Sequence, residues 1–495
     1  MVALRIIVNN SNITGVDGPS PVIFSQYPFT DKSLLLNGPN TKSSKVISSF
    51  ADLKWQPPPP FDQNKYDLID FARVHFGSLG IVTEIFIKTL ENFFVEGTDE
   101  IVPLESIIPK PKVKSSNLQK VFNEYDYLEF FYHPFNKLSC INGQLLPGDM
   151  WLKKAKILDA SIRAPPLKKI DPLDFTKEPL SKLLDKFIEA HEAEIEQSLI
   201  KNQGCCKSSI PVVLEFMGKL SYDFGLDPFC EGICLCCNNC FARTFCCFPK
   251  CRGRLKTKIT NIVPINTFTL YQQTAPKSLV DPEIEIPLNM IDDPEMIHFR
   301  TAWWNVIDKV KEYASKEEYP LNVMFHCRFN KPSKSILSSC YSPLSEDPNS
   351  VDYKNRWFAT IEFISIAHAG ADYATYLQRF IDEVVNMWLH VNDTKSGSPP
   401  EAEMTPRPHF AKSWFHVVAA KKVTGNIFKE NILAFDQFRN YVDPSGMFNG
   451  GLVKEFVNIV NGNSKDMITI NQMNDLESST IDDKNKVENE EDGLI

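Results

Sequence analysis

The sequence predicts an α+β protein with an antiparallel sheet flanked by helices, and three observations lead to this class. At about 150 residues per domain, 495 residues allow two or three domains with sizeable cores. Hydrophobic residues make up 43% and charged residues 23%, which is usual for a folded chain. In the second half, apolar periodicities follow the order strand, helix, strand, strand, helix, which favours α+β over a parallel α/β fold.

The first ninety residues predict two strands, a loop and a helix. VALRIIV near the N-terminus alternates as a strand does, and the Pro/Ser/Asn-rich stretch up to Gln63, with Pro57 to Pro60 in a row, is predicted as loop. Residues 66–74 favour a helix ended by Gly77. Residues 81–90 alternate strictly, which predicts a half-buried strand.

The remaining elements are longer. Residues 118–124 predict a helix, 125–132 an aromatic strand, and the Leu/Ile spacing over 180–195 a further helix. Residues 294–315 predict a helix with proline at its start, followed by strands over 322–329 and 357–366 and an amphipathic helix over 372–390. A last helix passes through Phe435 and Phe438. We find no internal repeat and no GxGxxG or Walker sequence.

Charge and hydropathy exclude several classes of protein. The net charge is −9, and residues 465–495, with nine acidic side chains and three lysines, account for −6 of it. This balance argues against a nucleic-acid partner, and residues 463–495 are predicted to be disordered. Neither an uninterrupted apolar run of spanning length nor a signal peptide is recognisable. We therefore expect a location in the cytoplasm or on the surface of an intracellular membrane.

Two segments carry residues suited to chemistry. Gly77 and Gly80 precede a strand, where small residues let the backbone approach a ligand, although a plain tight turn explains them equally. His326 and Arg328 are two residues apart on a predicted strand and so share a face; the pair suits alcohol oxidation, with a neutral imidazole as base beside a cation. A solvated strand face is the alternative. Glu362 lies inside an apolar predicted strand and is either a candidate partner of the His326 and Arg328 pair or an exposed side chain.

Together, three motifs resemble the vanillyl-alcohol oxidase (PCMH-type) superfamily of FAD-dependent oxidases, specifically its sugar-lactone oxidases (D-arabinono-1,4-lactone and L-gulonolactone oxidases) and type II cholesterol oxidases. They are ARVHFGSLGIVTEIFIKTL at 72–90, RPHFAK at 407–412 and DPSGMFN at 443–449. FFYHPF at 130–135 and EEYPLN at 317–322 are similar to the cholesterol-oxidase branch. The resemblance spans about residues 1–455.

The resemblance implies roles for particular residues. Arg328 and Lys412 would face flavin and substrate, with His326 as base and Glu362 nearby. The residues expected to bind the cofactor are Gly77, Ser78, Leu79, Gly80, His409, Lys412 and Asn449.

The chain departs from the family at several places. Where the family commonly has a glutamate as base, this chain has His326, and Glu362 stands where the cholesterol-oxidase branch has an asparagine. The pyrophosphate-binding half of the FAD domain and the residue that bonds flavin covalently are not recognisable. The implied division is a remnant FAD domain at 1–94, a cap domain at 95–400, a return to the FAD domain at 401–462 and the tail.

Eight cysteines lie between residues 230 and 251. Cys237 and Cys240 form a CxxC pair that Cys246 and Cys251 complete as one possible zinc site. Cysteines and phenylalanines beside the basic stretch up to residue 258 equally suit palmitoylation and peripheral membrane contact. A variable loop is the third interpretation.

Three functions follow. The first is FAD-dependent oxidation of a CH–OH group in a sugar lactone or sterol-like alcohol, with oxygen as acceptor. The second is a non-catalytic, degenerate or truncated family member that binds lipid or sterol. The third is a zinc-dependent interaction module built on the cysteine segment.

Overall fold

The computed structural model divides the chain into two compact units, and each is described by itself. The first unit comprises 1–90, 331–354 and 389–495, and the second comprises 91–330 and 355–388. The structure describes residues 3–14, 19–25, 45–53, 55–56, 61–87, 93–113, 116–135, 147–159, 258–264, 279–316, 318–321, 324–342, 351–366, 371–393, 406–409, 412, 428–448 and 451–461. The predicted helix at 180–195, the cysteine segment and the acidic tail lie outside these residues.

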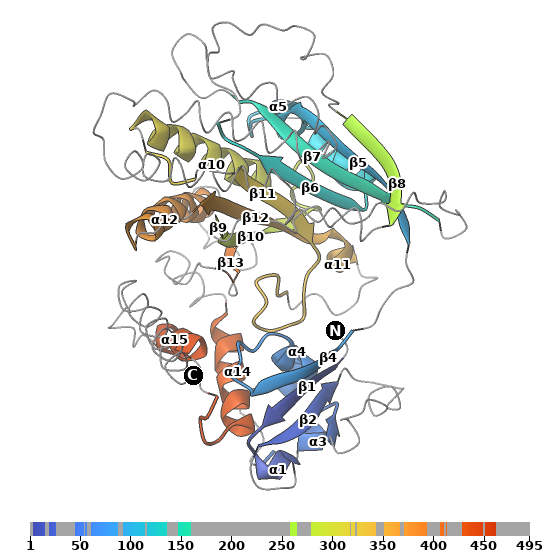
Figure 1. Ribbon diagram of the computed structural model, residues 1–495, viewed down its shortest axis with the longest axis vertical. Helices are drawn as coiled ribbons and strands as arrows, with labels where there is room; N and C mark the ends of the chain where they lie inside the picture. The colour runs from blue at the N-terminus through green and yellow to red at the C-terminus, as the bar shows by residue number, and fades with distance from the viewer. Residues whose placement is uncertain are drawn as a thin grey trace, which may run out of the picture. The chain divides into compact units, whose positions relative to one another are not determined.

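The first unit holds a small mixed sheet with strand order β3-β2-β1-β4. Strand β1 pairs antiparallel with β2 and β4, and β2 pairs parallel with β3 (Figure 1). The elements of this unit are β1 (Ala3–Val8), α1 (Ser11–Thr14), β2 (Ser20–Ser25), β3 (Lys45–Ile47), α3 (Phe50–Leu53), a 3-10 turn (Gln63–Lys65), α4 (Leu68–Arg73), β4 (Ile81–Phe86), β13 (Arg407–Pro408), α14 (Lys429–Val442) and α15 (Gly451–Val460).

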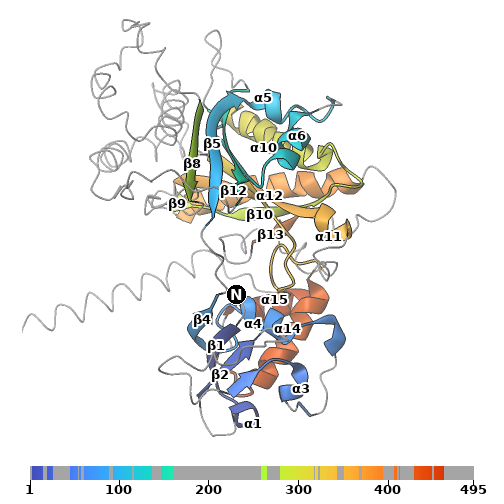
Figure 2. The same cartoon turned by 90° about the vertical axis from the view of Figure 1, so that its right-hand side faces the viewer.

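Aromatic side chains from distant parts of the sequence form the core of this unit. Phe438 of α14 packs against Phe24, Phe50 and Phe71, with ring centroids 5.0 to 6.3 Å apart. Burial of these rings is the main force that holds α14 against β2 and α4, because each large aromatic removes much apolar surface from water. Figure 2 shows α14 beside this sheet.

Two sequence predictions for the first unit are wrong. The stretch predicted as loop contains β2, β3 and two short helices, whose apolar residues alternate only briefly between prolines and serines. Strand β4 is not half-buried: Ile81, Val82 and Ile85 are 58%, 37% and 57% exposed. Both faces of the strand therefore carry exposed apolar side chains, and its alternation does not mark a covered face.

The second unit is an antiparallel sheet with helices on one face, which confirms the predicted α+β class. Its strand order is β10-β12-β11-β6-β7-β5-β8, and β9 pairs with β12. The elements are β5 (Phe94–Pro103), α5 (Leu104–Ile107), α6 (Asn117–Glu124), β6 (Tyr127–Tyr132), β7 (Asp149–Ile157), β8 (Lys258–Pro264), β9 (Leu279–Val280), β10 (Glu283–Asn289), α10 (Ile297–Ser315), β11 (Met324–Asn330), α11 (Val351–Asn355), β12 (Arg356–Ile366) and α12 (Ala371–Asp393).

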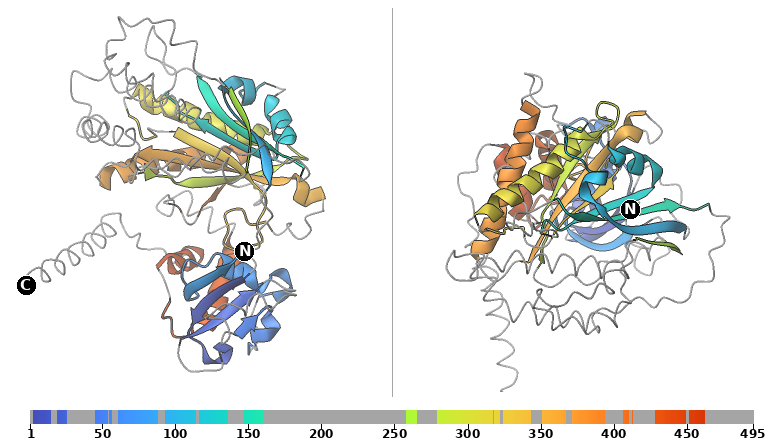
Figure 3. Two further views of the ribbon diagram at one scale, coloured as in Figure 1. Left: turned by 45° about the vertical axis from the view of Figure 1, so that its right-hand side comes forward. Right: turned by 90° about the horizontal axis from the view of Figure 1, so that it is seen from above.

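Helices α10 and α12 cover the apolar face of this sheet (Figure 3). Trp303 of α10 lies 4.4 Å from the ring of Phe325, and Phe380 of α12 packs against Phe363 at 6.3 Å. Helix α10 begins three residues after the predicted Pro294, because the Asp293 carboxylate accepts the backbone N–H groups of Ile297 and His298. Strands β5, β7, β8 and β10 were not predicted.

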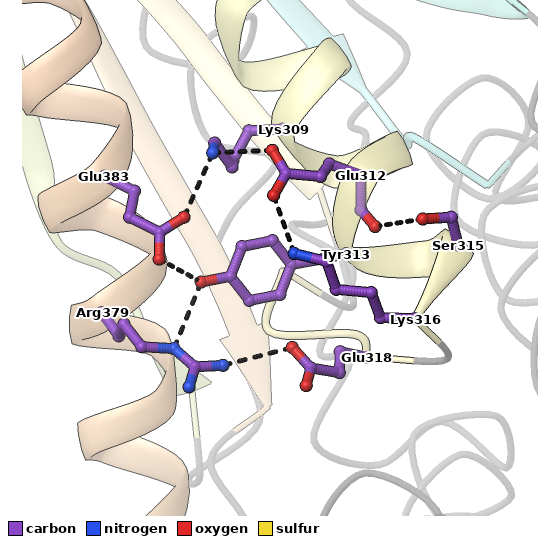
Figure 4. A network of polar contacts seen from close by, with 8 residues as sticks. All are labelled: Lys309, Glu312, Tyr313, Ser315, Lys316, Glu318, Arg379 and Glu383. Atoms are coloured by element: carbon purple, nitrogen blue, oxygen red, sulfur yellow. Dashed lines mark hydrogen bonds and ion pairs between the residues drawn. The ribbon is translucent and has the colours of Figure 1, made fainter.

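Polar side chains join the two helices at their exposed rim (Figure 4). The Tyr313 hydroxyl donates to Glu383 at 3.0 Å and accepts from Arg379 at 3.3 Å. Lys309 pairs with both Glu383 and Glu312. Glu383 and Arg379 are 39% and 55% exposed, so this network contributes little stability for each pair.

Candidate functional site

The face of the sheet opposite the helices carries charged side chains, and it brings three predicted site residues together. His326 and Arg328 project from the same face of β11. Glu362 of β12 lies directly opposite His326 in the antiparallel register. Each strand alternates, so the charged residues of β6, β10, β11 and β12 lie on one side, together with Phe131, and the aromatic residues that pack against α10 and α12 lie on the other.

His326 is enclosed between two carboxylates. Its Nδ1 lies 2.9 Å from Glu362 Oε2, and its Nε2 lies 3.6 Å from Glu129 Oε1 on β6. The ring stacks on Phe131, with centroids 4.3 Å apart and planes 9° from parallel. The side chain is only 1% exposed. The imidazole is therefore held in one place by packing on one side and by acidic groups at both nitrogens.

These surroundings set the charge of the imidazole. Burial lowers the pKa of His326, but the hydrogen bonds and charges of Glu129 and Glu362 act in the other direction and raise it above its ordinary value overall. The positively charged form therefore persists to higher pH than in an ordinary histidine. This differs from the neutral imidazole that the sequence analysis expected of a base.

Arg328 is the accessible cation of this face. Its guanidinium is 38% exposed, and it is paired with the fully buried carboxylate of Glu283 on β10. Burial lowers the pKa of Arg328, whereas Glu283 and the neighbouring glutamates raise it, with a net rise. A charged guanidinium fixed by a buried partner can bind and stabilise negative charge on a ligand.

Sequence reasoning did not identify three residues of this face. Glu129 interrupts the aromatic strand 125–132, and Glu283 and Glu285 alternate with isoleucines in EIEI. In both segments the sequence signal was one or two glutamates within an otherwise apolar run. Which charges meet, however, depends on the pairing of β10 with β12 and of β6 with β11.

In the first unit, the predicted cofactor residues form a tight turn before β4. Gly77 and Gly80 have φ of +75° and +140°, and the Ser78 N–H donates to His75 O at 2.8 Å. A Cβ at Gly80 would meet the backbone oxygen of Ile7 at 2.0 Å, so packing against β1 alone requires this glycine. A Cβ at Gly77 would meet open space.

The same turn buries polar atoms that none of the described residues satisfies. Ser78 Oγ and His75 Nδ1 are buried without a hydrogen-bond partner among the residues that the structure describes. Burial lowers the pKa of His75 to about 4, so its imidazole is neutral. Such groups usually have a partner in the functional state, which a ligand or water supplies.

The other predicted residues also belong to the first unit. The backbone N–H of Lys412 donates to His409 O at 3.0 Å, so the two lie in one turn after β13. Leu79 is fully buried in the core. Asn449 and the four cysteines proposed for zinc, Cys237, Cys240, Cys246 and Cys251, lie outside the described residues.

No cluster of His, Cys, Asp or Glu with a metal-binding arrangement occurs in the part of the chain that the structure describes. None of the helices in that part is both long enough and apolar enough to cross a membrane.

Comparison with solved structures identifies the fold. The chain matches cholesterol oxidase from Brevibacterium sterolicum at 12% identity and a TM-score of 0.51, covering 92% of this chain and 68% of that one. It matches a solvent-stable cholesterol oxidase at 10% identity and the same TM-score, covering 92% and 69%. No protein-family model and no curated protein matches the sequence. The two units together thus have a cholesterol-oxidase-like fold.

Proposed function

We propose that this chain is an FAD-dependent oxidoreductase that oxidises a CH–OH group, with oxygen as the electron acceptor. The observation that carries the proposal is the fold, which 92% of the chain shares with a cholesterol oxidase. The motifs at 72–90, 407–412 and 443–449 support it independently, because their resemblance rests on local sequence and not on the fold.

The HFGSLG turn fits a flavin nucleotide. The buried and unpartnered Ser78 hydroxyl and His75 Nδ1 leave hydrogen-bonding capacity for polar groups of a ligand, and Gly77 leaves open space beside the backbone. Bound FAD would supply hydride acceptance and electron transfer to oxygen. Residues Gly77, Ser78, Leu79 and Gly80 would hold it, together with His409, Lys412 and Asn449.

In the proposed reaction the residues of the polar sheet face orient the alcohol and handle its proton. Arg328, exposed and fixed by Glu283, would stabilise negative charge that develops on the substrate oxygen. A carboxylate that contacts His326 would receive the hydroxyl proton, and Glu362, whose Oε2 lies 2.9 Å from His326 Nδ1, is one such group.

The finer parts of the proposal concern substrate and location. We propose a sterol-like alcohol or a sugar lactone as substrate. The basic cysteine-rich stretch at 230–258 would provide peripheral contact with an intracellular membrane, which would suit a lipophilic substrate.

Flavin content tests the proposal directly. The full chain, expressed with added FAD and desalted, is expected to retain a stoichiometric visible flavin band. Ser78→Ala is expected to weaken FAD binding about tenfold, since a lost hydrogen bond costs roughly 1.5 kcal/mol. Ser25→Ala is the matched control, because Ser25 is equally buried but its hydroxyl already pairs with Ser48 at 2.7 Å.

A folded but colourless protein would contradict the proposal. That result would favour the alternative of a non-catalytic protein that binds lipid or sterol. If the Ser78→Ala and Ser25→Ala variants retained equally strong flavin bands, the proposal of an FAD protein would stand, but Ser78 would not be a cofactor contact.

A further inference from the structure

The two nitrogens of His326 both face carboxylate oxygens, which constrains the protons they carry. A neutral imidazole has one N–H donor and one lone pair. With the proton on Nδ1 for Glu362, the Nε2 lone pair would face Glu129 Oε1 at 3.6 Å, where two electron-rich atoms repel. Only the doubly protonated ring presents a donor to each carboxylate.

Other charged groups of this face have partners of their own. Arg328 neutralises Glu283, and Lys153 Nζ lies 3.2 Å from Asp99 Oδ1. Trp151 also donates to Asp99, at 3.0 Å. Among the remaining titratable groups, Glu285 accepts from the Thr360 hydroxyl.

Glu129 takes part in several of these contacts. It lies on β6 directly opposite Arg328 on one side and Lys153 on the other. It is also a hydrogen-bond partner of Tyr127, whose pKa rises through burial and through this carboxylate. With His326 charged, the group Glu129, His326 and Glu362 carries a net charge of −1.

We infer that Glu129 is a further positioning residue of the site: with Glu362 it holds His326 as a fixed cation, so the proton acceptor is the carboxylate pair rather than the imidazole. This inference rests on the proposed function for its catalytic part, but the charge state of His326 stands without it. The histidine that replaces a glutamate of the family is thereby compensated, since the three residues together carry the single negative charge that one glutamate would.

The accessibility of the three side chains agrees with this assignment. Glu129 and Glu362 are each 8% exposed, whereas His326 is 1% exposed and lies beneath Phe131. In the proton transfer the O–H bond of the alcohol breaks and a carboxyl O–H bond forms. The step moves one proton and no electrons, so it needs no reagent beyond the substrate of the proposed reaction.

Nitrogen chemical shifts of the histidine rings test the charge state in the full chain without turnover. With all nine histidines labelled with ¹⁵N, we expect one imidazole that keeps both protons to higher pH than an ordinary histidine does. Glu129→Gln and Glu362→Gln should each move the titration of this ring to lower pH. Glu100→Gln is the control, since Glu100 pairs with Lys154 away from this cluster.

If no ring in the parent protein kept both protons to higher pH than an ordinary histidine, the inference would be overturned, as it would be by a ring that both glutamine variants leave unchanged. This readout does not depend on flavin or substrate. A failure of the proposed oxidation is therefore distinguishable from a failure of the charge assignment.

The pH dependence of turnover in the flavin-loaded enzyme tests the catalytic part. His326→Gln should keep turnover within about tenfold at high pH and move the acid limb to higher pH, because two carboxylates without the cation repel each other. If His326 were the base, the same variant would lose about 10²- to 10⁴-fold at every pH, which would refute the assignment.

Discussion

The two faces of the large sheet are built by alternate residues of the same strands, yet they differ in almost every physical respect. On β11, Phe325 and Cys327 point toward α10 and α12, while His326 and Arg328 point to the opposite side. The helix-covered face is aromatic and dry. The opposite face buries ion pairs such as Arg328 with Glu283 and Lys153 with Asp99.

The difference indicates that the aromatic face mainly stabilises this unit, whereas the charged face mainly serves its function. Aromatic packing supplies stability through transfer of apolar surface from water. Buried charges repay their desolvation poorly, and replacing them with apolar residues is often neutral or stabilising. The buried charges gathered around His326 are therefore better explained by binding or chemistry at that face than by folding.

The largest expected loss of stability comes from removing a large side chain from the apolar face. Trp303 is fully buried and contacts the rings of Phe130, Phe299 and Phe325. Trp303→Ala should lower the free energy of unfolding by about 3–5 kcal/mol, measured by denaturant titration. Trp303→Phe is the control, because it keeps an aromatic ring and should cost only about 1–2 kcal/mol. Equal losses in the two variants would contradict the cavity explanation.

The next effect concerns the pH dependence of stability, to which two buried histidines, His133 and His326, contribute in opposite directions. Burial lowers the pKa of His133 to about 3, and its Nδ1 accepts the Phe135 N–H at 3.2 Å. The unfolded chain therefore binds a proton below about pH 6.5 that the folded chain does not. Stability should fall by about 2 kcal/mol between pH 7 and pH 5 through this residue alone.

Stability curves of the parent and His133→Gln at the two pH values measure this effect. The variant should lose the His133 part of the acid sensitivity, and His75 in the first unit should retain its own. His326 acts in the opposite direction: its raised pKa adds stability below the unfolded value and loses it as pH rises through the folded one. An unchanged acid slope in His133→Gln would show that His133 is not neutral in the folded state.

The smallest expected effect concerns the rim network between the two helices. Glu383→Gln removes one charge that pairs with Lys309 at 3.1 Å and accepts from Tyr313 at 3.0 Å. Because Glu383 is 39% exposed, the loss of unfolding free energy should be about 0.5–1 kcal/mol and should shrink at high salt. A salt-independent loss above about 2 kcal/mol would mean that the network stabilises the fold about as strongly as packing in the aromatic face does.

Local patterns predicted much of the second unit because its elements are long and periodic. The strands at 322–329 and 357–366 and the helix at 372–390 correspond to β11, β12 and α12 within a few residues. The short strands β2 and β3 were missed, since a few alternating residues between prolines and serines give no clear period. Strand β4 was assigned correctly as a strand but wrongly as half-buried.

The sequence by itself determined the α+β class, the motifs that resemble FAD-dependent oxidases and the shared face of His326 and Arg328. These follow from local periodicity and from residues close together in the chain. Only the tertiary structure decided that Glu129, nearly two hundred residues before His326, lies 3.6 Å from its ring, and that Glu283 neutralises Arg328. The physical reason is strand register, which joins residues distant in sequence and which no local pattern encodes.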